Sequence, residues 1–122
     1  IFSCDAPVSA EPGEAGTRRI AEHDGLEALT HFRVIERSGD GTALLEAVPV
    51  TGRTNQIRLH LHHLGHPVVG DPAYTSAPCG IQTLDPCAPP LCLHAWKLTL
   101  SHPLGGHEMT FEADCIDSER FA

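Results

Sequence analysis

Residues 51–71 constrain the fold of this chain most, because an amphipathic segment lies there among two arginines, a glutamine and four histidines. Its apolar residues recur at i, i+4 and i+7, the spacing of one buried stripe on an α-helix: Ile57, Leu61 and Leu64. Thr54 is a suitable N-cap and Gly65 a suitable C′ residue. We therefore predict a helix between Thr54 and Gly65, with a polar face able to hold an anion or a carboxylate.

Alternating apolar residues predict strands on both sides of this helix. Residues 28–37 and 42–50 flank a strong turn signal at residues 38–41, so they should form a β-hairpin with Pro49 at a strand end or edge. Residues 91–101 and 108–113 should form further strands. The expected fold class is α+β: an antiparallel β-sheet of at least four strands with one main helix packed on it.

The length of 122 residues fits one domain. Residues 1–27 show no sustained period and are expected to be a largely irregular lead-in, whereas residues 114–122 are expected to be a frayed tail. Residues 73–90 contain several prolines and small residues, which predicts a long loop that is either functional or mobile. The chain begins with Ile1 rather than Met, which suggests a processed or excised piece.

Charge and composition narrow the function classes. The formal net charge is −8, so RNA binding by bulk charge is not expected, and any RNA contact must use a local patch. Four of the arginines lie in the middle of the chain: Arg33, Arg37, Arg53 and Arg58. No apolar run approaches the roughly 20 residues that cross a bilayer, and no signal peptide is visible. An odd number of cysteines, irregularly spaced, favours a reducing compartment, and we expect a cytoplasmic protein.

Arg58 is the main candidate for a functional side chain, because it falls near the start of the predicted helix, where anions are favoured. A carboxylate docked on its guanidinium would have its pKa lowered by roughly 1–3 units, which keeps an aspartate ionised. The alternative is an exposed helix arginine. Arg53 precedes the helix and is a candidate to grip a phosphate or a base, or else is a solvated loop charge.

Metal binding is disfavoured by spacing. His62 and His66 are four residues apart, but no Glu lies between them and Pro67 places His66 beyond the helix end. Hydrogen bonding to RNA or helix capping is favoured for all four histidines: His60, His62, His63 and His66. The cysteines in or beside the long loop match no usual zinc spacing, and apolar packing is the preferred interpretation: Cys79, Cys87 and Cys92. We expect no metal site.

Three strings together are similar to the carboxy-terminal half of the RluA-type RNA pseudouridine synthases: TGRTNQIRLHLHHLGHPVVGD, LCLHAWKLTLSHP and HEMTFEA. The upstream THFRVIERSGDGTALLEAVPV resembles the strand pair that precedes the motif in that family, so the resemblance covers about Ala28 to Ala113. It implies an enzyme that isomerises uridine to pseudouridine in structured ribosomal or transfer RNA without a cofactor, after flipping the target nucleotide out of its helix.

The resemblance also implies site residues. Arg58 matches the motif arginine that pairs with the catalytic aspartate, and Gln56 matches a glutamine that supports the site. Leu93 matches an apolar position near the target base, although core packing explains it equally well. The family usually has His where this chain has Asn55, which can still donate a hydrogen bond. We therefore expect a substrate-binding set made of Arg53, Asn55, Gln56, His60 and Leu93.

The family's nucleophile is missing, because the HRLD-type motif that carries the catalytic aspartate does not occur in this sequence. Asp71 is expected to form a turn rather than to act as that nucleophile. The chain is thus expected to be a partial domain that is inactive alone, with no aspartate for Arg58 to hold. A missing amino-terminal half would leave sheet edges open, so self-association is also expected. The alternatives are a non-catalytic RNA-binding module and an assembly fragment without RNA contact.

Overall fold

The computed structural model describes residues 1–13, 16–74 and 90–114. The chain divides into two compact units, Ile1–Cys92 and Leu93–Ala122, and each is described by itself. Most of the predicted loop over residues 73–90, with Cys79 and Cys87, and nearly all of the predicted tail lie outside the described residues.

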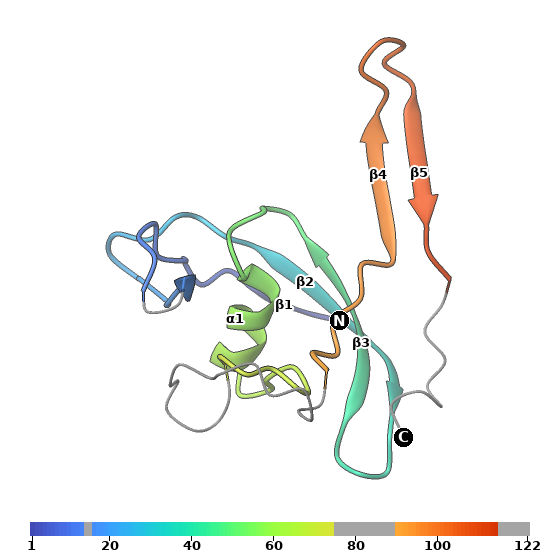
Figure 1. Ribbon diagram of the computed structural model, residues 1–122. Helices are drawn as coiled ribbons and strands as arrows, with labels where there is room; N and C mark the ends of the chain where they lie inside the picture. Colours follow the sequence, from blue (N-terminus) through green and yellow to red (C-terminus); the bar gives the residue numbers. More distant parts are fainter. Residues whose placement is uncertain (14–15, 75–89, 115–122) are drawn as a thin grey trace. The chain divides into compact units, whose positions relative to one another are not determined.

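The first unit contains a three-stranded antiparallel sheet in the order β1-β2-β3 (Figure 1). These strands are Phe2–Cys4, Thr30–Arg37 and Ala43–Pro49. β2 and β3 form the predicted hairpin, and its turn is closed where the backbone N–H of Ser38 donates to the carbonyl of Thr42 at 2.9 Å. Pro49 ends β3, as expected for a residue that has no N–H to donate to a ladder.

The lead-in over residues 1–27 has little regular secondary structure, as expected, but it contributes more to the core than its sequence suggests. β1 pairs with β2, and Val8 forms bridges with Ile20 and Leu26. The side chains of Cys4 and Val8 are buried. The lead-in is therefore an integral layer of the first unit, because its few apolar residues close both hydrophobic clusters.

Helix α1 spans Gln56–His63 and packs between the sheet and the lead-in (Figure 1). Leu61 packs with Cys4 and Phe32 in one cluster. Leu59 packs with Val8 of the lead-in and with Tyr74 in a second cluster. The predicted single stripe is therefore wrong in part. Ile57 is half-buried and Leu64 is exposed, while Leu59 is buried, because the helix is covered on two flanks rather than one.

The ends of α1 follow different rules from those expected. Asn55, not Thr54, is the N-cap, and its backbone is left-handed with φ 57°. Asn adopts this conformation more readily than most residues. At the other end Gly65 has φ 87°, and its N–H donates to the carbonyl of His62 at 3.0 Å, which confirms it as the predicted C′ residue.

The second unit contains a hairpin of β4 (Lys97–Ser101) and β5 (Glu108–Glu112). Its register divides the two faces: one face carries the apolar pairs Leu98–Phe111 and Leu100–Met109, and the other carries polar pairs such as Thr99–Thr110. The strand predicted over residues 91–101 begins only at Lys97. In the described part of the chain, five strands form two sheets, so the expected single sheet of at least four strands is corrected, although the α+β class is confirmed.

Candidate active site

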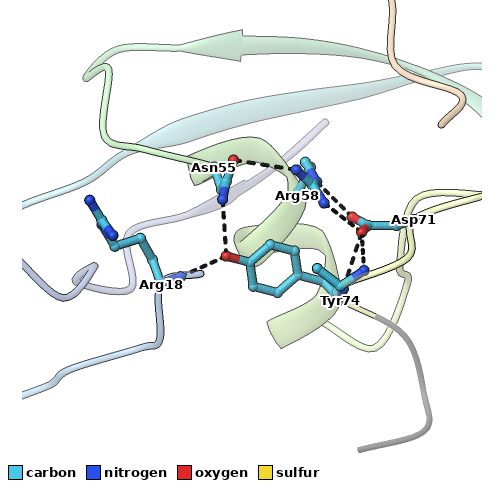
Figure 2. A network of polar contacts seen from close by, with 6 residues as sticks. Arg18, Asn55, Arg58, Asp71 and Tyr74 are labelled. Carbon is cyan, nitrogen blue, oxygen red and sulfur yellow. Dashed lines mark hydrogen bonds and ion pairs between the residues drawn. The ribbon is translucent and has the colours of Figure 1, made fainter. Parts of the chain in front are cut away.

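Arg58 projects from the first turn of α1 and is paired with Asp71, which lies in the turn after the helix (Figure 2). Its Nε donates to Oδ2 of Asp71 at 2.8 Å, and its Nη2 donates to Oδ1 at 2.7 Å. This is a bidentate pair, the strongest arrangement of an arginine with a carboxylate. The expectation that Arg58 has no aspartate of its own chain to hold is therefore wrong. Asp71 lies 13 residues further along the chain, and the turn after α1 brings it back alongside the helix.

The carboxylate of Asp71 is buried, and both of its oxygens accept hydrogen bonds. Its side chain is 0% exposed, and Oδ1 also accepts the backbone N–H groups of Ala73 at 2.9 Å and Tyr74 at 3.1 Å. Burial by itself would raise the pKa of Asp71, but these hydrogen bonds and the Arg58 charge outweigh it and hold the pKa below its ordinary value. The turn role predicted for Asp71 is confirmed by these two backbone bonds. A carboxylate without exposed surface is poorly placed to attack a nucleotide.

Tyr74 ties this pair to the lead-in (Figure 2). Its hydroxyl accepts the backbone N–H of Arg18 at 2.8 Å and the side-chain amide of Asn55 at 3.3 Å. Its ring lies under the guanidinium of Arg58, 5.1 Å from ring centroid to Cζ, a cation–π contact. Asn55 completes the network, because its Oδ1 accepts from Nη1 of Arg58 at 3.3 Å. Arg58 is thus held by an acid, an amide and an aromatic face.

Gln56 and His60, both expected to bind substrate, are buried and hydrogen-bonded within the chain. Gln56 is 3% exposed, its Oε1 accepts from Thr51 and from the backbone of Arg53, and its Nε2 donates to Leu29 and Thr30. Both the oxygen and the nitrogen of the Gln56 side-chain amide are therefore hydrogen-bonded within the chain. Gln56 therefore fixes the loop before α1 to the start of β2.

His60 is 0% exposed and bridges α1 to β2 and to the lead-in. The carbonyl of Ala6 can only accept, so Nε2 of His60, 2.8 Å away, must carry the hydrogen. Its Nδ1 then accepts from the hydroxyl of Thr30 at 2.9 Å. Burial lowers the pKa of His60 below its ordinary value, which favours this neutral ring. Because neither ring nitrogen is accessible, we withdraw His60 from the substrate-binding set.

The substrate-binding roles predicted for Arg53 and Leu93 remain proposals. Nε of Arg53 donates to the carbonyl of Glu27 at 2.8 Å, which anchors the stem of the guanidinium at the first-unit surface. Leu93 is 42% exposed and begins the second unit. Within the described ranges, no group of three or more His, Cys, Asp or Glu side chains is arranged to hold a metal ion. In the same ranges, no helix is both long and apolar enough to span a membrane.

Asp71 and Tyr74 are the site residues that sequence reasoning missed. The sequence offered one signal: the Gly70-Asp71 turn follows the helix closely, and a turn aspartate can reach a helix arginine only if the chain reverses there. Gly70 makes that reversal possible with φ 78°, and a Cβ at this position would clash with the carbonyl oxygen of Pro90.

Comparison with known proteins identifies the family of this chain. The family model described as RNA pseudouridylate synthase matches residues 2–63, which are 62 of the 122 residues. The chain belongs to this family. The match begins at residue 2, so it includes the lead-in that the motif-based resemblance had left out.

Relatives of this chain carry consistent names. It is 37% identical over 109 residues to the dual-specificity RNA pseudouridine synthase RluA of Escherichia coli (strain K12), covering 89% of this chain and 48% of that protein. It is 42% identical over 89 residues to the RluA protein of Haemophilus influenzae, covering 73% and 38%. It is 40% identical over 115 residues to the ribosomal large subunit pseudouridine synthase D of Nitrosomonas europaea, covering 93% and 33%. The chain therefore spans about half or less of the length of these relatives.

Proposed function

We propose that this chain is the carboxy-terminal part of an RNA pseudouridine synthase, which isomerises uridine to pseudouridine in ribosomal or transfer RNA in the cytoplasm. The observation that carries the proposal is Arg58, the family's motif arginine, held in one orientation by three neighbouring side chains. The names of the relatives, which specify RNA pseudouridine synthases, support the reaction class.

The reaction breaks the C–N glycosidic bond, turns the base and rejoins it through carbon, and the family uses an aspartate for it. Asp71 does not fit that role, because its carboxylate has no exposed surface and accepts four hydrogen bonds. We therefore propose that the nucleophile comes from another polypeptide segment, which corresponds to the part of the relatives that this chain does not cover. Arg58 would keep that acid ionised by lowering its pKa.

An isomerisation assay tests whether Arg58 and the nucleophile come from different segments of the polypeptide. The chain alone and the complete polypeptide encoded by its reading frame are incubated with transcribed ribosomal and transfer RNA, and pseudouridine is counted. We expect no turnover by the chain alone and turnover by a polypeptide that also carries an HRLD-type aspartate. Turnover by the chain alone, abolished by Asp71→Asn, would show that the nucleophile has been misplaced.

RNA contact is proposed through Arg53, whose guanidinium is held at the surface by the Glu27 carbonyl. Filter binding of structured RNA at two salt concentrations tests it. Arg53→Ala should weaken binding and reduce the salt slope by about one phosphate contact. Binding that is independent of salt and of Arg53 would remove this contact from the proposal.

Association is proposed at the hairpin of the second unit, either with the missing half or with a second copy. A two-stranded hairpin is marginal by itself, and its apolar face carries side chains such as Leu98 and Phe111, which are 58% and 53% exposed. Light scattering of the chain should show species larger than a monomer. A strict monomer at high concentration would contradict self-association.

A further inference from the structure

We propose that Asp71 is a positioning residue: it grips one edge of the Arg58 guanidinium so that the other edge is presented to a second carboxylate. The identity of that second acid, the nucleophilic aspartate of the synthase, rests on the proposed function. The division of the guanidinium into a held edge and a presented edge rests on the geometry of this chain (Figure 2).

The hydrogen-bond donors of Arg58 show which edge is left. A guanidinium has five N–H groups in one plane. The Nε group and one Nη2 group donate to Asp71, and one Nη1 group donates to Asn55. One N–H on Nη1 and one on Nη2 remain, and they have no acceptor among the described residues. Because Asp71 occupies the Nε–Nη2 edge, the remaining N–H of Nη2 points to the Nη1 side, and a second carboxylate can accept from the guanidinium there.

Asp71 is rigid enough to set this orientation. Its backbone N–H donates to the carbonyl of Val68 at 3.1 Å, and its side chain holds the N–H groups of Ala73 and Tyr74. The preceding turn is pinned where the N–H of Cys92 donates to Val69 at 2.9 Å. The position of the Asp71 carboxylate is therefore fixed by its own turn, and it sets the orientation of the Arg58 guanidinium.

The charge of the site favours a singly charged planar acid. The Asp71 carboxylate already neutralises Arg58, so the presented edge acts mainly through directed hydrogen bonds rather than through net charge. The Arg58 side chain is only 18% exposed, which limits access to a narrow group. A carboxylate supplied by the rest of the synthase fits these conditions better than the phosphate backbone of RNA, and the two are distinguishable by small probes.

A simple electrostatic role for Asp71 predicts the opposite response to mutation. If Asp71 only reduced the positive charge of Arg58, Asp71→Asn should strengthen the binding of an anion. If Asp71 positions Arg58, the same change should weaken it, because the introduced amide would face Nε with a donor and displace the guanidinium. The sign of the effect therefore separates the two roles.

The test uses the ¹⁵N-labelled chain, sodium acetate as the carboxylate probe and dimethyl phosphate as the phosphate probe. We expect acetate to shift the Arg58 Nη resonances saturably and to leave the Nε–H resonance in place. Asp71→Asn should weaken this binding by at least about tenfold, the equivalent of one lost charge-assisted hydrogen bond. Arg58→Lys should abolish the response. The control is Glu46→Gln, which breaks the exposed Arg33–Glu46 pair and should leave the Arg58 response unchanged.

Several outcomes would overturn the proposal: no acetate response at Arg58, a response at Nε that shows displacement of Asp71, tighter acetate binding in Asp71→Asn, or a stronger response to dimethyl phosphate. None of these readouts involves RNA or turnover, so the proposal can fail while the synthase activity stands, and the reverse also holds. In the active polypeptide, Asp71→Asn should move the acid limb of the pH–rate profile to higher pH. In an Arg58→Lys background, Asp71→Asn should add little further loss, because both changes act through one group.

Discussion

Breaking the buried Arg58–Asp71 pair should destabilise the folded chain far more than breaking the exposed Arg33–Glu46 pair, although both have an N–O distance of 2.7 Å. The difference is burial. The Asp71 and Arg58 side chains are 0% and 18% exposed, whereas those of Glu46 and Arg33 are 24% and 56% exposed. Water can replace the partner of an exposed charge, but it cannot reach the carboxylate of Asp71.

The substitution Asp71→Asn measures this effect. One oxygen of the introduced amide can still accept from Ala73 and Tyr74, so the turn itself is preserved. The amide NH₂ then faces the Nε–H of Arg58, and a charged hydrogen bond is replaced by two opposed donors. Breaking a buried pair costs about 3–5 kcal/mol, and the partial exposure of Arg58 places the expected loss near the lower end, about 3 kcal/mol. Glu46→Gln should cost less than about 1 kcal/mol.

Urea unfolding at pH 7, followed by circular dichroism, gives both free energies of unfolding. The m-values of the two variants should agree with that of the unchanged chain, which would show that only stability has changed. Acidification adds a second check. Because the pKa of Asp71 is lowered in the folded state, its contribution is present above the ordinary value of 3.8 and is lost as the pH falls through the lower folded value. Equal costs for Asp71→Asn and Glu46→Gln would refute the burial argument.

Three further predictions concern the surrounding residues. His60 has a lowered pKa in the folded state, so the free energy of unfolding should fall as the pH drops below about 6.5. Urea titrations at several pH values should show that this free energy depends less on pH in His60→Gln. Tyr74→Phe keeps the ring under Arg58 but removes the hydroxyl that accepts from Arg18 and Asn55, and it should lower the free energy of unfolding by about 1–3 kcal/mol in the same assay. Asn55→Ala and Asn55→Gly lose the same side-chain bonds, so the left-handed backbone should make the Gly variant more stable by about 1 kcal/mol; an equal loss would show that φ 57° carries no strain.

The sequence by itself determined the β2–β3 hairpin, the position of α1 and the family. Alternation and turn residues predicted the β2–β3 hairpin, and the apolar spacing with Gly65 predicted α1, because these signals depend on neighbours within a few residues. The ordered string from Thr51 to Asp71 identified the enzyme family that the comparison confirmed. It also placed Arg58 as the central side chain, since residue type and position within a motif need no tertiary information.

Only the tertiary structure decided what each polar side chain contacts. His60 and Gln56 lie in the same motif as Arg58, yet the lead-in and β2 cover them and use their hydrogen-bonding groups. Asp71 was expected to do no more than form a turn, but the reversal at Gly70 carries it onto Arg58. The physical reason is that burial and pairing come from segments distant in the chain. Residues 1–8, for example, show no clear periodicity but supply side chains to both hydrophobic clusters.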